Sequence, residues 1–354
     1  MRLMFLYHLM GIRAADAGST QDIHSYTRVA KMLGHEVVVY GPTDTHPSFS
    51  FSMDVASADA VVFIFEWTTE LRYREQLDLA RVVSTVPRER RIVIDCDGAY
   101  NTLVSIAGDY NHRDVAASRL WMDICDSVSD KICQPTLHPL LPNVRPFLFY
   151  AYDPASALSL DFRAKDYGMV YVGQSRFRWL SMERVLRAIE LIRERVGRIC
   201  LIGHGWDALP PWATRMGIED AYYTDRVYLE KLNVEIMPPV PFAYVSEWMS
   251  KGAFNPVLVR PIFNRLRLVT PRFFETLAAN TIPLFVLHPA QVQEIYGNDA
   301  LELVLPEDHP EDKISDMVCR PEHYREVLQV VRAHLAEKHS HAARFQELVE
   351  IVKE

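Results

Sequence analysis

Cysteine is scarce in this chain of 354 residues, and the five that occur do not form a recognisable framework. They are odd in number, widely spaced and never arranged as C-x-x-C: Cys96, Cys125, Cys133, Cys200 and Cys319. A disulfide scaffold needs paired cysteines, and a structural zinc site needs closely spaced ones. The sequence therefore predicts free thiols in a reducing compartment.

Clustered positive charge and long apolar runs are also missing. The formal net charge is -8, whereas a surface that binds nucleic acid needs a clustered positive face, so we expect no nucleic-acid partner. No apolar run is long enough to span a membrane, and the N-terminal run LMFLYHLMG is too short and too weakly basic for a signal peptide. We expect a cytoplasmic protein without a transmembrane segment.

The chain does contain a repeated alternation of apolar runs and helical patterns. Apolar runs at 2–9, 36–40, 60–65 and 91–94 begin the series, and runs at 169–172 and 199–202 continue it. Such a pattern is typical of parallel sheets covered on both faces by helices. Because the chain is long enough for two domains, we expect an α/β fold with two Rossmann-like domains. No G-x-G-x-x-G motif is present to indicate a dinucleotide site.

The expected division follows from this series. We expect an N-terminal domain over 1–150, a linker over 151–168, a C-terminal domain over 169–335 and a closing helix over 336–354. Within them, the proline-rich run HPLLPNVRPF is expected to be a plain connection, and further strands are expected at 257–260 and 301–305. The tail from residue 322 is expected to be helical.

The most informative stretch is LVTPRFFETLAANTIPLF, residues 268–285. Thr270 can cap a helix that starts with Pro271, which leaves backbone amides pointing outward at the positive end of the helix dipole. That end can hold a phosphate, Arg272 beside it suits a diphosphate, and Glu275 suits a pair of ribose hydroxyls. An ordinary capped helix with a surface Arg and Glu pair is the alternative.

The run TPRFFETLAANTIPLF resembles the donor-binding motif of GT-B glycosyltransferases, especially the retaining group 1 and spore-maturation (CgeB-like) enzymes. Their pattern is T-P-R-x-F-E-A-L-A-x-G followed by a strand. The resemblance implies that Glu275 holds the nucleotide ribose. Asn280 stands where glycine is usual, and asparagine also enters the left-handed conformation. Arg267 stands where the E-x7-E form of the motif has its first acid.

The same resemblance implies further donor-binding residues. The strand at 169–172 ends in Gly173, followed by Arg176 and Arg178, like the opening of a GT-B C-terminal domain in which a basic residue reaches the diphosphate. The two arginines are alternates, and a solvated approach to the next helix is the other interpretation of both. His204 lies in a turn that resembles the glycine-rich turn beneath the nucleotide.

The string IVIDCDGAYN carries the main competing interpretation. An apolar strand running into D-x-D resembles the nucleophile motif of haloacid-dehalogenase (HAD)-type phosphatases, and D-x-D alone resembles the metal motif of GT-A glycosyltransferases. Both would require a divalent cation. Alternatively, Asp95 and Asp97 cap the next turn. In the GT-B interpretation, Asp97 lies across the cleft from the donor and orients an acceptor hydroxyl, and His112 contacts the donor sugar unless it is a solvated loop histidine.

The expected function is glycosyl transfer from a nucleotide-diphosphate donor, UDP-, GDP- or dTDP-linked, to a small molecule, glycan or protein acceptor. The resemblance implies retention of the anomeric configuration. Arginines and the helix terminus would stabilise the leaving diphosphate, so no metal and no cofactor besides the donor are expected. The alternatives are a metal-dependent D-x-D enzyme and a catalytically inactive nucleotide-sugar-binding subunit, to which Arg267 in place of an acid would point.

Overall fold

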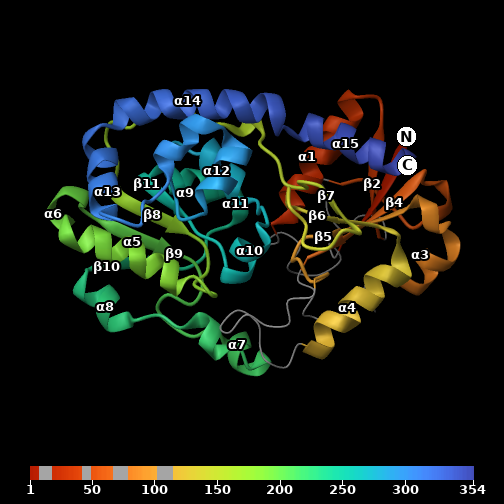
Figure 1. Ribbon diagram of the computed structural model, residues 1–354, viewed down its shortest axis with the longest axis horizontal. Coiled ribbons are helices and arrows are strands. Elements are labelled where there is room, and N and C mark those ends of the chain that lie inside the picture. Colours follow the sequence, from red (N-terminus) through yellow and green to blue (C-terminus); the bar gives the residue numbers. More distant parts are fainter. Residues whose placement is uncertain (8–17, 42–48, 67–78, 102–114) are drawn as a thin grey trace.

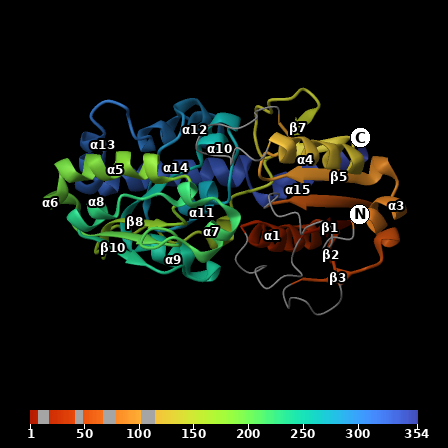
Figure 2. The same cartoon turned by 90° about the horizontal axis from the view of Figure 1, so that it is seen from below.

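The computed structural model describes residues 1–7, 18–41, 49–66, 79–101 and 115–354, and it contains two parallel sheets (Figure 1). We call the first sheet with the helices around it the N-lobe and the second sheet with its helices the C-lobe. The lobes lie side by side along the long axis, as the view turned by 90° also shows (Figure 2). None of the helices in the described ranges is long and apolar enough to cross a membrane.

The N-lobe is built on a seven-stranded sheet with the order β3-β2-β1-β4-β5-β6-β7, in which all neighbouring strands are parallel. The central residues of its interior strands are apolar because both faces of the sheet are covered, and alternate residues enter two different cores. The strands are β1 Arg2–Leu6, β2 Glu36–Tyr40, β3 Phe51–Ser52, β4 Ala60–Phe65, β5 Arg91–Asp95, β6 Lys131–Gln134 and β7 Val144–Pro146.

Helices of the N-lobe lie on both sides of this sheet (Figure 2). They are α1 Ser19–Met32, α3 Leu79–Thr85 and α4 Val115–Val128, with the short 3-10 turns η2 Val55–Ser57 and η3 Arg88–Arg90. Helix α1 starts where the loop after β1 ends, so its first turn lies at the carboxyl edge of the sheet.

The C-lobe is built on a five-stranded parallel sheet with the order β10-β9-β8-β11-β12. Its strands are β8 Tyr167–Val172, β9 Ile199–Ile202, β10 Val234–Met237, β11 Gly252–Val257 and β12 Ile282–Phe285. Its helices are α5 Trp179–Leu191, α6 Arg193–Val196, α7 Pro211–Met216, α8 Arg226–Lys231, α9 Val245–Ser250, α10 Pro261–Leu266, α11 Arg272–Ala278, α12 Pro289–Tyr296, α13 Pro310–Cys319 and α14 Pro321–Lys338, with 3-10 turns η5 Glu219–Tyr222, η6 Phe242–Tyr244 and η7 Asn298–Leu303.

The chain crosses between the lobes twice, at neighbouring places. The first crossing follows β7 and includes η4 Pro154–Ser156. The second follows α14, which runs along the top of the C-lobe toward the N-lobe (Figure 1). The two crossings are joined where the Tyr152 amide donates to the His339 carbonyl at 2.9 Å. Helix α14 also contains residue 335, the expected end of the second domain.

The last helix, α15 His341–Lys353, belongs to the N-lobe in space. It packs beside α1, and both chain termini lie in that lobe (Figure 1). The buried His341 ring contacts Asp22 of α1, with 3.0 Å between Nε2 and Oδ1. Burial raises the pKa of Asp22, opposed by the hydrogen bond from His341. The expected helical tail is thus two helices, broken at His339 and Ser340.

Three expected elements differ in the structure. The connection HPLLPNVRPF contains the short strand β7. The strand expected at 257–260 lies earlier, as β11, because Pro261 starts a helix directly after Arg260. The strand expected at 301–305 is largely the 3-10 turn η7, which touches the sheet only by a single bridge between Phe285 and Val304.

Candidate functional site

The carboxyl ends of strands from the two sheets meet between the lobes. Asp97 follows β5, and its Oδ1 lies 3.8 Å from Nη2 of Arg260, which follows β11. Gly98 is equally close to the C-lobe, because a Cβ built on it would lie 2.6 Å from Cδ1 of Leu268. Parallel α/β sheets bind ligands at this edge, so the cleft between the lobes is the candidate site.

The N-lobe wall of this cleft carries acids that follow neighbouring strands. Tyr7 follows β1, Glu66 follows β4 and Asp97 follows β5, and these three strands are adjacent in the sheet. The Tyr7 hydroxyl donates a short hydrogen bond to Oε2 of Glu66, and the Ser19 amide of α1 approaches the same oxygen at 3.4 Å. Burial raises the pKa of Glu66 to about 7, opposed by the Tyr7 hydrogen bond and aided by the nearby Asp97.

Asp95, the first acid of the D-x-D string, has a structural role. Its carboxylate accepts from the amides of Ala99 at 3.0 Å and Tyr100 at 2.8 Å, and from the side chain of Gln134 at 2.8 Å. Burial raises its pKa to about 6. The turn-capping interpretation is therefore confirmed for Asp95, and Asp97 alone of the pair reaches the other lobe. Within the described ranges, no group of three or more His, Cys, Asp or Glu side chains could hold a metal ion.

The C-lobe wall carries a cluster of arginines at the ends of β8 and β11. In the part of the chain that the structure describes, Nε of Arg176 is buried without a hydrogen-bond partner. Burial, and next the charge of Arg260, lower the pKa of Arg176, which still remains a cation because an arginine starts near 12.5. Arg178 donates to the Arg176 carbonyl at 2.7 Å and so stands beside it. A buried guanidinium with an unused donor suits an anionic ligand.

Gly203 allows the loop after β9 to pack backbone against backbone on the loop after β8, at Gly173. A Cβ on Gly203, whose φ is +144°, would lie 2.4 Å from the Gly173 carbonyl oxygen. The same carbonyl accepts from Nε1 of the fully buried Trp206 at 2.7 Å. His204 lies in the second of these loops and is exposed, with its ring edge-on to Trp212 at 4.7 Å between centroids. The structure thus brings Gly173 and His204 to one edge of the C-lobe.

Helix α11 carries the motif residues. Arg272 Nη1 lies 3.1 Å from Glu275 Oε2, and about a fifth of each side chain is exposed. Burial raises the pKa of Glu275, opposed by Arg272. Pro271 directly precedes Arg272 and has helical angles, φ -50° and ψ -37°, as a proline at the first helical position does. The Thr270 carbonyl accepts from the Phe273 amide at 3.0 Å, and the Thr270 side-chain cap stays a prediction.

The start of α11 touches the N-lobe at the start of α1. A Cβ on Gly18 would lie 3.0 Å from Cγ of Pro271 and 3.4 Å from Oε1 of Glu66. The start of the motif helix therefore lies close to Gly18 and to Glu66, which follows β4. His112 lies outside the described residues.

Two residues of the motif region differ from their expected geometry. Asn280 does not take a positive φ angle. Its side chain instead exchanges hydrogen bonds with the backbone of Asp161 in the linker, at 2.8 and 2.9 Å. The left-handed residue is Arg267, with φ +50°, which ends α10 and lies 3.8 Å from Glu294.

The carboxyl end of α11 is fixed by Arg332 of α14. Its guanidinium donates to the carbonyls of Leu277 at 2.7 Å, Ala279 at 2.8 Å and Leu158 at 2.6 Å, and more weakly to Ala278 at 3.3 Å. Helix α11 therefore has its first turn at the cleft and its last turn tied to both the linker and the crossing helix.

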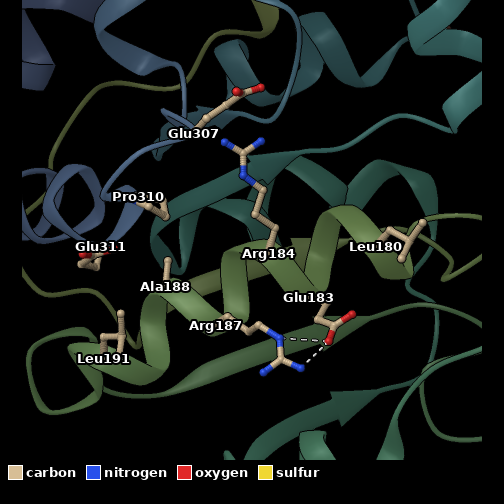
Figure 3. Close-up of a pocket in the computed structure, with 9 residues that line it drawn as sticks. All are labelled: Leu180, Glu183, Arg184, Arg187, Ala188, Leu191, Glu307, Pro310 and Glu311. Carbon is tan, nitrogen blue, oxygen red and sulfur yellow. Dashed lines mark hydrogen bonds and ion pairs between the residues drawn. The ribbon is translucent and has the colours of Figure 1, made fainter.

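A separate pocket of about 430 Å³ lies on the outer side of the C-lobe, between α5 and the start of α13 (Figure 3). Its charged groups are paired to the protein: Arg187 contacts Glu183 at 2.6 Å, and Arg184 donates to the Pro306 carbonyl at 2.6 Å. It shares no residue with the cleft. The lining residues are Leu180, Glu183, Arg184, Arg187, Ala188, Leu191, Glu307, Pro310 and Glu311.

Comparisons with known proteins bear on the fold. No protein-family model and no curated protein matches the chain. Among solved structures, T4 phage BGT in complex with UDP-glucose is similar with a TM-score of 0.60 at 12% identity, over 99% of both chains. An alpha-glucosyltransferase in complex with UDP and a 13-mer DNA gives a TM-score of 0.66 at 14% identity, over 100% of this chain and 99% of that one. TarM of S. aureus gives 0.51 at 8% identity, over 84% of this chain and 56% of that one.

These likenesses extend over both lobes and confirm the expected architecture of two parallel sheets facing across a cleft. The narrower resemblance to spore-maturation enzymes stays a prediction. The chain has the GT-B glycosyltransferase fold.

Proposed function

We propose that this protein is a glycosyltransferase that binds a nucleoside-diphosphate sugar in the cleft between its lobes and transfers the sugar to an acceptor. The observation that carries the proposal is the arginine cluster around Arg176, whose buried Nε has no partner within the described residues, at the carboxyl ends of β8 and β11. A GT-B fold with an unused guanidinium donor at this edge suits a diphosphate.

The donor would lie along the C-lobe wall. Arg176 or Arg178 and, after β8, the Gly173 turn would contact the diphosphate, and Arg272 would contact it from the start of α11. These cations would stabilise the charge that develops on the leaving diphosphate, which is the main electrostatic requirement of the reaction. Glu275, next to Arg272, would accept hydrogen bonds from the ribose hydroxyls.

Residues near these ones would complete the donor site. His204 lies beside the Gly173 turn with an exposed ring, and we propose that this ring contacts the nucleotide. Thr270 and Pro271 shape the approach to α11, with Pro271 against Gly18 of the other lobe. These assignments rest on the resemblance of the motif and on the proximity of the loops after β8 and β9.

The acceptor would approach from the N-lobe wall. Asp97 follows β5 and lies 3.8 Å from Arg260 of the other lobe, so its position suits the role of orienting an acceptor hydroxyl. His112 keeps its proposed contact with the donor sugar, from a loop outside the described residues. We propose retention of the anomeric configuration, and the anomeric proton coupling of the product in NMR tests it.

Metal independence is also a proposal. The arginines would supply the positive charge that a divalent ion supplies in other transferases. One similar structure, T4 phage BGT, was solved with UDP and Mn2+, so the test is activity in EDTA with and without added Mn2+. Full activity in EDTA is the expected result, and a strict requirement for Mn2+ would reject this part of the proposal.

The acceptor class needs a direct test. We propose a small molecule, glycan or protein acceptor because the net charge is -8. However, T4 BGT is described as a DNA-modifying enzyme and the alpha-glucosyltransferase was solved with DNA, so the likeness gives no support to excluding nucleic acid. Transfer of labelled sugar to duplex DNA at low salt, beside transfer to extracts freed of nucleic acid, separates the two.

The remaining expectations are kept as proposals. A cytoplasmic location agrees with five cysteines that are all free in the structure. The division at 150, 168 and 335 into an acceptor-side domain, a linker, a donor-binding domain and a closing helix is a functional one, to be tested by domain-wise ligand protection.

The first experiment is a thermal-shift and calorimetric screen against UDP, GDP and dTDP and their sugars, because a ligand that binds only the folded state raises its melting temperature. Glu275→Ala should then weaken binding of the preferred nucleotide by about 1.5–3 kcal/mol through loss of charge-assisted hydrogen bonds. That loss is a factor of about 10 to 150 in Kd.

Glu183→Ala is the matched control, since Glu183 forms a similar Glu and Arg pair on α5 outside the cleft. Its nucleotide affinity should equal that of the unmodified protein. Absence of binding to every nucleotide and nucleotide sugar would reject the proposed function. Binding without transfer or donor hydrolysis with any acceptor would instead identify a nucleotide-sugar-binding subunit.

A further inference from the structure

The N-lobe wall contains an acid that the proposed reaction has not used. Glu66 lies at the end of β4, between the ends of β1 and β5 in the sheet order, and it is only partly exposed. Its position is comparable to that of Asp97, which follows the next strand. The two acids nevertheless have different surroundings, since Asp97 lies near the cation of Arg260 and Glu66 does not share that contact.

The two oxygens of Glu66 also have different surroundings. Oε2 accepts the hydrogen bond from the Tyr7 hydroxyl and lies 3.4 Å from the Ser19 amide. Oε1 lies 3.4 Å from the place where a side chain on Gly18 would begin, and Cγ of Pro271 lies 3.0 Å from the same point. Glu66 therefore uses one oxygen inside the N-lobe and presents the other toward the start of α11.

Burial is the largest influence on the charge of Glu66, and it outweighs the hydrogen bonds from Tyr7 and Ser19, which favour the charged form. Among the described residues, the titratable groups that interact with it are Tyr7, Cys96, Asp97 and Tyr150. None of these is a cation, and burial raises the pKa of both Cys96 and Tyr150 well above their ordinary values. With its pKa raised to about 7 by burial, Glu66 is about half neutral at pH 7 and mostly neutral below that pH.

A neutral carboxylic acid has a donor that a carboxylate lacks. Because Oε2 accepts from Tyr7, we place the proton of the neutral acid on Oε1, the oxygen near Gly18 at the start of α1, where Pro271 of the other lobe also lies. Sugar hydroxyl oxygens accept such a bond, and a site that hydrogen-bonds a hydroxyl discriminates strongly against an analogue that lacks it.

We propose that Glu66 is a specificity residue for the sugar being transferred, and that as a neutral acid it donates a hydrogen bond from Oε1 to a hydroxyl of that sugar. This inference rests on the proposed function, because it requires a nucleotide sugar with its diphosphate at the arginine cluster. It assigns to the N-lobe the recognition of the sugar, while α11 and the arginines recognise the nucleotide.

The test compares Glu66→Gln with Glu66→Ala. The Gln amide keeps an oxygen for Tyr7 and an NH2 donor in place of the Oε1 hydroxyl, whereas Ala has neither. We expect Glu66→Gln to keep the KM for the nucleotide sugar within about threefold and Glu66→Ala to raise it tenfold or more, with the Kd of the nucleoside diphosphate unchanged in both. A set of deoxy-sugar donors then locates the hydroxyl, because the loss from Glu66→Ala should disappear for the donor that lacks it.

The pH dependence gives a second readout. Affinity of the unmodified protein for the nucleotide sugar should fall as pH rises through about 7, where Glu66 loses its proton, and Glu66→Gln should not show this fall. Affinity for the nucleoside diphosphate should show no such difference between the two proteins.

Distinct outcomes overturn distinct statements. If Glu66→Gln raises the KM for the nucleotide sugar as much as Glu66→Ala does, the side chain acts as a carboxylate and the inference is wrong. If Glu66→Ala weakens the nucleoside diphosphate as much as the nucleotide sugar, its role is structural, and the inference is again wrong. If the unmodified protein binds no nucleotide sugar at all, the proposed function itself fails, independently of the variants.

Discussion

Replacing Arg332 with alanine tests how α11, the helix that carries Arg272 and Glu275, is held in place. Arg332 donates to carbonyls at the end of α11 and to the linker carbonyl of Leu158, so it does for this helix what a capping motif does for others. Removing it leaves buried carbonyls without their partner. The change acts on a helix whose other end carries Arg272 and Glu275.

The expected loss can be worked out from the bonds. Three of the four contacts are 2.8 Å or shorter, and hydrogen bonds to a charged group contribute about 1.5–3 kcal/mol each when measured singly. They share one guanidinium and are not additive, and water can reach part of a side chain that is partly exposed. We therefore expect Arg332→Ala to lower the free energy of unfolding by about 3–5 kcal/mol.

The assay is urea unfolding followed by fluorescence, together with hydrogen exchange of the α11 amides, which should lose protection first. Arg325→Ala is the matched control, because Arg325 lies on the same helix in an exposed pair with Glu322 and should change stability by less than about 0.5 kcal/mol. Nucleotide affinity should also fall in Arg332→Ala. A loss below about 1 kcal/mol, or unchanged exchange in α11, would refute the reasoning.

Two further predictions concern the cleft. Gly98→Ala should lower the free energy of unfolding by about 1–3 kcal/mol, because φ is +65° and the new Cβ would meet Leu268. The control Gly34→Ala, with φ +77° and open space around it, should lower it by only about 1 kcal/mol, from the backbone conformation alone. Equal losses in thermal unfolding would contradict the contact with Leu268. Because the pKa values of Glu66 and Asp95 are raised in the folded state, to about 7 and about 6, these two groups should lower the free energy of unfolding as pH rises from about 5 to 7, whereas His339, whose pKa burial lowers to about 4, acts in the opposite direction below about pH 6.5. Glu66→Gln should be more stable than the unmodified protein by about 1–3 kcal/mol at pH 8 and equal to it at pH 4 in denaturant titrations, and a gap that grows toward acid pH would show that the sign is wrong.

Apolar runs predicted much of the fold because the strands of covered parallel sheets must be apolar throughout. The runs at 36–40, 60–65 and 199–202 coincide with β2, β4 and β9. The prediction of strands from apolar runs failed at η7, where the run does not form a strand of the sheet. It also misplaced β11, because this strand contains the polar Asn255 and the imino residue Pro256. Local sequence does not reveal which run finds a partner strand, because pairing is decided by the tertiary structure.

The positions of candidate residues were predictable when a motif marked them, although their roles stay predictions. Arg272 and Glu275 pair on α11 as expected, and Asp97 reaches the other lobe. Arg260 was missed because the strand before it was placed too late, which made Arg260 a strand residue instead of the first residue of the cleft. Glu66 also ends an apolar run, and that position was the available signal.

Arg332 shows the opposite case. Its partners are backbone carbonyls from segments that are 53 to 174 residues away, and backbone groups carry no signature in the sequence. Such a residue can be found only from coordinates.

The paired crossings between the lobes have a mechanical consequence. The two chain segments joined at Tyr152 and His339 form a hinge on one side of the cleft, so any opening of the cleft requires backbone rotation near these residues. The contacts between the lobes, where Pro271 meets Gly18 and Asp97 meets Arg260, would then separate. Exchange of substrate and product would be governed by a few backbone torsion angles near this hinge, remote from the reacting groups.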